Sequence, residues 1–270
     1  PAFGPGELSA VNGVMGALAE GVPICGWVGL PSSQLRREGR VLHHMLRDGD
    51  YRLNAQICRQ ATVDSVELTP DNAIAETERI IDSCLTHRKP VYINIPQDLA
   101  DMPVVGEPIV GVPLAQVPPK PSNPDQLRVA TKKLKEALQG AQSAVALPSY
   151  LVARYGLEDK FREFAAKTGI AYATGPMDKA VASEADDQFL GMYIVIISTP
   201  GVKAAVESAD VVIDFDVCFS DENSGAWTSV IDPAKHIVIG ADFVRVGDLH
   251  ATPVSMADAL DARAAKIEEG

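Results

Sequence analysis

The feature that most constrains this fold is an alternation of helix-type and strand-type apolar spacing that starts at the first residues. Apolar side chains recur at helical intervals over residues 8–18, and a continuous apolar run, typical of a strand covered on both faces, follows over residues 22–30. A second helical stripe, with Asp71 or Asn72 as its cap, leads to a strand at residues 90–96. Such alternation predicts a parallel sheet with crossover helices.

A proline-rich segment interrupts this alternation and predicts a boundary between two structural units. Seven prolines lie between residues 103 and 124, where their missing N–H groups and fixed φ angles exclude a helix or a central strand. We therefore predict an α/β fold with two units, residues 1–98 and 125–270, joined by a linker over residues 99–124. Each unit should contain a parallel sheet flanked by helices, and the second should be Rossmann-like.

The second unit has its own sequence of predicted elements, in which helices and strands again alternate. Helices are predicted near residues 126–138, 158–168 and 202–208 and from residue 255, and strands at residues 144–147, 170–173, 211–215 and 236–239. This order predicts a sheet that is independent of the first.

Charge and cysteine content narrow the classes of partner. The formal net charge of −12 would repel phosphate backbones and anionic lipid, so we expect neither nucleic acid nor a membrane surface as a partner. No apolar run approaches the ~20 residues of a membrane span. The four cysteines form no Cys-x-x-Cys pair, which argues against zinc and against a disulfide framework. We expect a cytoplasmic chain with reduced thiols, no metal on its own residues, and a small metabolite as its partner.

Two short motifs in the first unit carry candidate chemistry. The sequence Gly4-Pro-Gly6-Glu7 precedes the first predicted helix, where a sharp turn can present free N–H groups to a polar ligand, although such a motif by itself is more often only a tight turn. The other motif is the pair His43-His44. Two charged imidazoles about 6 Å apart repel by roughly 3 kcal/mol at an effective dielectric of about 20. One neutral and one protonated ring would suit a proton shuttle, whereas an arbitrary His-His pair is more often two partly exposed side chains.

Taken together, the motifs resemble those of the pyruvate, indolepyruvate and phenylpyruvate decarboxylases, a thiamine-diphosphate-dependent family. In the first unit the similar segments are Phe3-Gly-Pro-Gly-Glu-Leu-Ser-Ala-Val-Asn-Gly13, Val28-Gly-Leu-Pro-Ser32, Leu42-His-His44, Asp48-Gly-Asp-Tyr51 and Lys89-Pro-Val-Tyr-Ile93. In the second unit they are Pro176-Met-Asp-Lys179, Gly191-Met-Tyr193, Ser198-Thr-Pro-Gly-Val202, Glu207-Ser-Ala-Asp210 and Asp221-Glu-Asn-Ser-Gly225. The resemblance covers essentially the whole chain.

The resemblance implies a partial pyrimidine-binding domain followed by the family's middle domain. It implies a decarboxylase that converts a 2-oxo acid, pyruvate or an aromatic analogue, to an aldehyde and carbon dioxide. Thiamine diphosphate and Mg²⁺ would be its cofactors, and a homodimer or homotetramer its assembly. By position, His43 and His44 are the implied catalytic residues, and Gly4, Gly6 and Glu7 lie near the cofactor's pyrimidine.

The family's activating glutamate and its diphosphate- and metal-binding segment have no counterpart here, so we expect this segment to be inactive alone. A different class of function remains open: a non-catalytic module whose second unit binds a nucleotide or acts in assembly. A carboligase relative that binds flavin or coenzyme A in its second unit is a third possibility.

Overall fold

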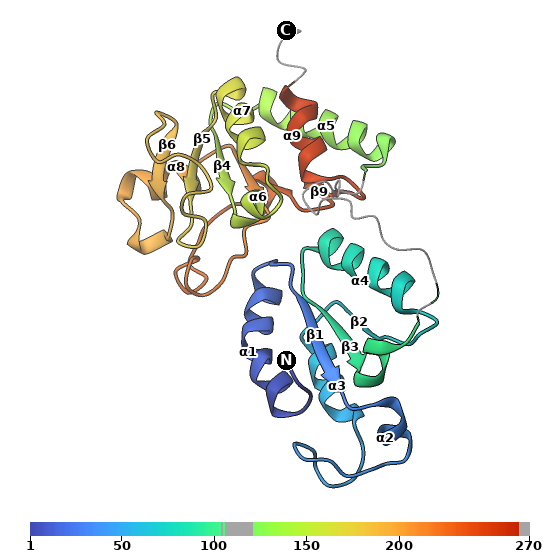
Figure 1. The fold of residues 1–270 in the computed structure, drawn as a ribbon. Helices are drawn as coiled ribbons and strands as arrows, with labels where there is room; N and C mark the ends of the chain where they lie inside the picture. Colours follow the sequence, from blue (N-terminus) through green and yellow to red (C-terminus); the bar gives the residue numbers. More distant parts are fainter. Residues whose placement is uncertain (104, 106–120, 265–270) are drawn as a thin grey trace. The chain divides into compact units, whose positions relative to one another are not determined.

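The computed structural model describes residues 1–103, 105 and 121–264, which belong to two units, Pro1–Pro118 and Pro119–Gly270 (Figure 1). Most of the linker predicted over residues 99–124 lies outside the described residues. At its start, Gln97–Asp101 forms the 3-10 helix η1. Each unit has its own sheet and its own cores, so each is described by itself.

The first unit is built on a three-stranded parallel sheet of order β1-β3-β2. Its strands are β1 (Cys25–Leu30), β2 (Asp64–Glu67) and β3 (Val91–Pro96). The apolar strands β1 and β3 were predicted. The edge strand β2 was not, because its sequence Asp-Ser-Val-Glu is short and mostly polar and shows no apolar alternation.

Helices cover both faces of this sheet. Because successive side chains of β3 point to opposite faces, they pack against different helices. The helices are α1 (Pro5–Ala19), α2 (Ser33–Arg37), α3 (Arg52–Gln60) and α4 (Ala73–His87). Val91 and Ile93 pack in one core with Ile80 of α4. Tyr92 points to the other face and packs with Cys58 of α3 and Val11 of α1.

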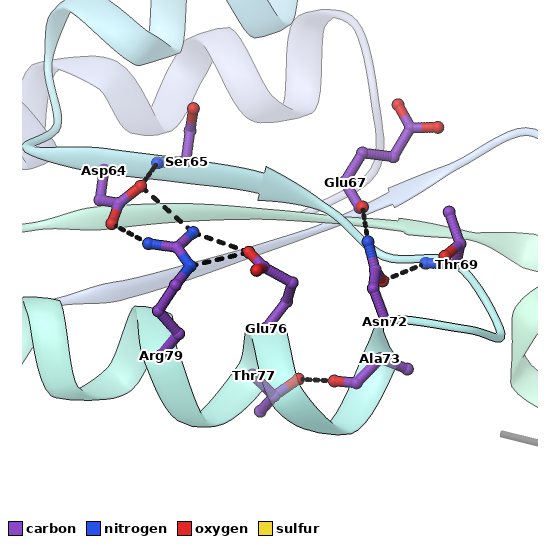
Figure 2. Close-up of polar contacts among 9 residues, drawn as sticks. All are labelled: Asp64, Ser65, Glu67, Thr69, Asn72, Ala73, Glu76, Thr77 and Arg79. Carbon is purple, nitrogen blue, oxygen red and sulfur yellow. Dashed lines mark hydrogen bonds and ion pairs between the residues drawn. The ribbon is translucent and has the colours of Figure 1, made fainter. Parts of the chain in front are cut away.

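Polar contacts join α4 to the edge strand, as Figure 2 shows. Asn72 occupies the N-cap position, but its side-chain oxygen accepts the Thr69 N–H at 2.7 Å and its amide donates to the Glu67 carbonyl at 3.3 Å. Arg79 donates to Asp64 of β2 at 2.5 Å and pairs with Glu76 at 2.7 Å. The guanidinium thereby ties the helix to the strand.

These contacts also settle the charge state of Asp64. Burial opposes ionisation of this carboxyl, but hydrogen bonds from Arg79 and from the Ser65 N–H outweigh burial and lower its pKa. The pair therefore stays ionised at neutral pH. Because both side chains are partly exposed, we expect a modest contribution of up to about 1 kcal/mol to the free energy of unfolding.

The second unit contains a seven-stranded sheet of order β10-β9-β8-β7-β4-β5-β6. Its strands are β4 (Ala144–Pro148), β5 (Ala171–Thr174), β6 (Phe189–Met192), β7 (Val211–Phe215), β8 (His236–Ile239), β9 (Val244–Val246) and β10 (Leu249–Ala251). Strands β4 to β8 are parallel to one another, whereas β9 and β10 add an antiparallel edge. Strands β6, β9 and β10 were not predicted. The central parallel part has the predicted Rossmann-like character.

Helices pack on both faces of this sheet as well. They are α5 (Pro124–Gln139), α6 (Tyr150–Arg154), α7 (Glu158–Thr168), α8 (Pro200–Glu207) and α9 (Met256–Ala264), with short 3-10 turns η3 (Val195–Ile197) and η4 (Pro233–Lys235). The larger core lies under α5, α7 and α9 and includes Phe161 and Phe215, while the smaller lies under α8 around Val206. A mixed α/β fold with parallel sheets flanked by helices is thus confirmed.

Two classes of site find no support in the described parts of the chain. None of the helices there has the length and apolar character needed to cross a bilayer. Nor do residues 1–103, 105 and 121–264 contain a group of three or more His, Cys, Asp or Glu side chains placed to bind a metal ion.

Candidate active site

The Gly4 turn sets the geometry at the start of α1. Gly4 has φ +75°, in the left-handed region that favours glycine, and Pro5 then begins the helix with its fixed φ. The Gly4 carbonyl accepts the Leu8 N–H at 3.1 Å, and Glu7 turns back so that its Oε1 accepts the Gly4 N–H at 2.8 Å. The predicted turn is therefore present, but its Gly4 N–H is hydrogen-bonded to Glu7 and not free for a ligand.

Glu7 lies inside the unit. It is 3% exposed, and its second oxygen, Oε2, accepts a hydrogen bond from the hydroxyl of Tyr92 on β3. Burial and the neighbouring Glu7 raise the pKa of Tyr92, so its phenol remains a proton donor. Both Glu7 oxygens are thus engaged by groups of this chain, and the carboxylate can act on the site by holding the turn.

The two histidines lie in the loop between α2 and α3, not in a helix. The base of this loop is closed where the hydroxyl of Tyr51 donates to the Arg40 carbonyl at 2.6 Å. Gly49 packs there so tightly that a Cβ would come 2.5 Å from the Gly39 carbonyl oxygen. His44 itself has φ 71°, an unusual conformation for a residue with a side chain, of the kind that concentrates at functional sites.

The two imidazoles lie closer together than the sequence argument assumed. Their ring centroids are 4.4 Å apart at an interplanar angle of 73°, an edge-to-face arrangement. The ring of Phe3 lies 6.3 Å from His43 and 6.2 Å from His44, and its other neighbour, Tyr51, is 6.3 Å away. Both imidazoles are exposed in this chain, so they can reach a ligand that lies over the loop.

The Gly4 turn and the histidine loop touch each other. A Cβ built on Gly4 would lie 2.6 Å from the His44 carbonyl oxygen and 3.0 Å from its Cβ, which glycine alone avoids. Gly6 differs from Gly4: it is exposed in the first turn of α1, and a Cβ there would meet only ordinary contacts at 3.9 Å from Ala2 and Pro1. The structure therefore brings Gly4, Glu7 and the histidine pair together and leaves Gly6 beside them.

Sequence reasoning missed the aromatic residues that support this site. Phe3 contacts both histidines, Tyr51 closes their loop, and Tyr92 holds Glu7. The sequence held one signal for Tyr92: side chains alternate along a strand, so Tyr92 must face away from Val91 and Ile93. In the structure this is the face that α1 covers.

The site can handle protons and pack against a ring, because it offers two imidazoles and a phenyl group. The described residues contain no group of three or more His, Cys, Asp or Glu side chains placed to bind a metal ion, so the side chains here suit the ring system of a thiamine-type cofactor and not its metal-bound diphosphate. Mg²⁺ and diphosphate would need ligands from elsewhere.

Comparisons with known proteins show the family to which the chain belongs. Residues 131–265 match the family model of the thiamine pyrophosphate enzyme central domain. The chain is 33% identical over 268 residues to an alpha-keto-acid decarboxylase of Mycobacterium leprae, covering 97% of this chain and 45% of that protein. It is 34% identical to proteins of the same name from Mycobacterium bovis and Mycobacterium avium, covering 97% of this chain and 46% of each.

The chain spans about half the length of these relatives. Because the matched central domain makes up half of the chain and the motifs of both units agree with it, the chain belongs to the thiamine pyrophosphate enzyme family.

Proposed function

We propose that this chain is part of a thiamine-diphosphate- and Mg²⁺-dependent non-oxidative decarboxylase that converts a 2-oxo acid to an aldehyde and carbon dioxide. The observation that carries the proposal is the exposed, edge-to-face pair His43 and His44, held against the Gly4 turn. Relatives named alpha-keto-acid decarboxylases, which align over 97% of the chain, support the same reaction.

The side chains have separate roles in this proposal. Thiamine diphosphate, when bound, supplies the carbon nucleophile and the electron sink for loss of carbon dioxide. His43 and His44 hold and move protons at the substrate oxygen and at the carbon that becomes the aldehyde. Because their rings are 4.4 Å apart, the two imidazoles place two groups that can donate or accept a proton beside the same part of a bound substrate.

The proposal extends to the assembly and to pyruvate or an aromatic analogue as the substrate. The chain spans about half the length of its relatives, which supports a proposal that the Mg²⁺ and diphosphate ligands belong to parts of the protein outside this sequence. For that reason we propose that the 270-residue chain is inactive alone and that the complete protein works as a homodimer or homotetramer. The four free cysteines fit the proposed cytoplasmic location.

The nucleotide-binding alternative gains no support from the second unit. A pocket lies at the carboxyl ends of β4, β5 and β7, where α/β sheets often bind ligands. Its volume of about 10 Å³ is far below the roughly 300–1,000 Å³ of small-molecule sites.

A kinetic experiment tests the proposal. The complete protein that contains this chain, supplied with thiamine diphosphate, Mg²⁺ and either pyruvate or phenylpyruvate, should release aldehyde, whereas the 270-residue chain should not. His43→Gln and His44→Gln should each lower kcat/KM by about 10²–10⁴-fold, because each removes a positioned proton carrier. Since both rings are exposed, the free energy of unfolding should change by less than about 0.5 kcal/mol.

His87→Gln is the matched control, because His87 is bonded to the Ser83 carbonyl within α4 and has no role in the proposed site. Its kcat/KM should equal that of the wild type. Full activity in both loop variants would remove the site assignment, and absence of aldehyde from the complete protein with every 2-oxo acid would remove the function.

A further inference from the structure

A buried hydroxyl on the central strand is linked to the histidine loop by a short series of contacts. Tyr92 is 5% exposed and Glu7 is 3% exposed, although they are 85 positions apart in the sequence. The Tyr92 hydroxyl donates to Glu7 Oε2, and Glu7 Oε1 accepts the N–H of Gly4. One carboxylate therefore bridges β3 and the turn before α1.

The next contact leads from the turn to the histidine loop. The Gly4 main chain lies so close to His44 that a Cβ on Gly4 would be 2.6 Å from the His44 carbonyl oxygen. Because His44 has a positive φ, its main chain has few alternative conformations that would keep this packing. A shift of the Gly4 turn would therefore displace His44.

Tyr92 is well placed to fix this series of contacts. β3 is paired in parallel with β1 on one side and β2 on the other, so the phenol is attached to the most constrained strand of the unit. Its burial keeps it away from any ligand over the loop. A role for Tyr92 in the reaction must accordingly be indirect.

We propose that Tyr92 is a positioning residue whose hydroxyl, through Glu7 and Gly4, sets the location of the His44 main chain and imidazole. Its importance for catalysis rests on the proposed function, while its effect on the position of His44 does not. The two can be tested separately.

Nuclear magnetic resonance of the histidine rings in the 270-residue chain tests the positional effect. Phe3 and the paired imidazoles should displace the His43 and His44 ring signals by their ring currents, with assignment by His43→Gln and His44→Gln. Tyr92→Phe keeps the buried ring but removes the donor, so this displacement should be lost for His44. The signals of His87, His236 and His250 should stay unchanged and serve as internal controls.

Tyr172→Phe is the matched variant, because it removes a buried hydroxyl that donates to Ser183 and Asp186 in the second unit. It should leave the His43 and His44 signals as in the wild type. His44 signals of Tyr92→Phe that superimpose on those of the wild type would overturn the proposal.

A second variant covers the case in which Tyr92→Phe fails to fold. Glu7→Asp keeps the charge but is one methylene too short to reach both Gly4 and Tyr92, and it should cause the same loss at His44. Unchanged His44 signals in Glu7→Asp would equally overturn the proposal.

Kinetics of the complete protein then measure the catalytic consequence. Tyr92→Phe should lower kcat by about 10- to 100-fold, with a smaller change in KM, because misplacement of a proton carrier affects the chemical step. A complete protein with no decarboxylase activity would refute the proposed function, and the ring signals would still decide the positioning role.

Discussion

Gly4 is the residue at which two separate demands on the backbone meet. Its φ of +75° is accessible to glycine at little cost, and its missing Cβ leaves room for the His44 carbonyl. Any other residue at this position would have both a strained backbone conformation and a steric clash between its Cβ and the His44 carbonyl oxygen. The Gly4 turn is therefore a structural requirement of the histidine loop, whatever else its N–H group does.

Gly4→Ala should destabilise the first unit and displace the histidine loop. A left-handed φ and a contact at 2.6 Å together should reduce the free energy of unfolding by about 1–3 kcal/mol. Chemical denaturation measures the loss, and the His44 ring signal reports the displacement. Gly13→Ala is the control: Gly13 lies in α1 with open space around a Cβ and should gain up to about 1 kcal/mol. Equal stabilities for the two variants would contradict the argument.

At the scale of elements, the buried side chain of Asp178 links the segment that follows β5 to the segment that follows β4. Asp178 follows β5 and is 2% exposed, and its Oδ1 accepts the Tyr150 N–H at the start of α6 at 2.7 Å. Burial raises the pKa of Asp178, and the nearby Asp214 adds to this, although the hydrogen bonds from Tyr150 and Gly175 oppose it. The carboxyl therefore holds its proton more tightly in the folded state than in the unfolded chain.

This difference predicts the pH dependence of an Asp178→Asn variant. At pH values between the unfolded and the folded pKa of Asp178, the folded wild type binds more protons than the unfolded chain. The contribution of this carboxyl to stability is therefore complete below the unfolded pKa and is lost as pH rises through the folded pKa. The amide of the variant would not ionise, but its oxygen could still accept the Tyr150 N–H. Relative to the variant, the wild type should thus be less stable at pH 7 than at pH 4. Once pH exceeds both pKa values, the loss in the free energy of unfolding should be about 1.4 kcal/mol for each unit by which the folded pKa exceeds the unfolded pKa.

Urea unfolding at both pH values measures this change. Asp187→Asn, at an exposed position in the same connection, should follow the wild type. A stability difference between the wild type and Asp178→Asn that stays constant with pH would contradict the assignment.

At the scale of the whole molecule, each unit is stabilised by its own residues. In the second unit, Phe161 contacts the rings of Tyr172 and Phe215 at centroid distances of 5.5 and 5.3 Å. In the first, Ile80 of α4 packs with Val91 and Ile93. Among residues 1–103, 105 and 121–261, none belongs to both cores, so we expect damage to one core to leave the other intact.

Phe161→Ala should destabilise the second unit alone, by about 3–5 kcal/mol, through loss of buried contacts and a cavity. Hydrogen exchange followed by mass spectrometry should show lost protection in β4, β5 and β7 and normal protection in β3. Ile80→Ala should produce the reciprocal pattern, with a loss of about 2–5 kcal/mol in the first unit. Loss of protection in both units from either variant would show that they unfold together.

The predicted elements that the structure confirms are those whose apolar pattern is strong. Strands β3, β4 and β7 are mostly buried runs rich in aliphatic residues, and helices such as α4 and α5 have clear apolar stripes. Strand β1 is also where it was predicted, but it is not covered on both faces, because Trp27 and Gly29 are exposed. Edge strands β2 and β6 and the β9–β10 hairpin escaped prediction because strands of three or four residues are too short to show a recognisable apolar pattern.

For this protein, the sequence alone determined the α/β class, the turn at Gly4 and the presence of two adjacent imidazoles, because local spacing and residue type encode these features. The tertiary structure decided that the rings lie 4.4 Å apart and that Glu7 faces inward to Tyr92. Contacts between positions so far apart depend on how strands pair and which face each side chain takes, and these follow from the packing of the whole sheet.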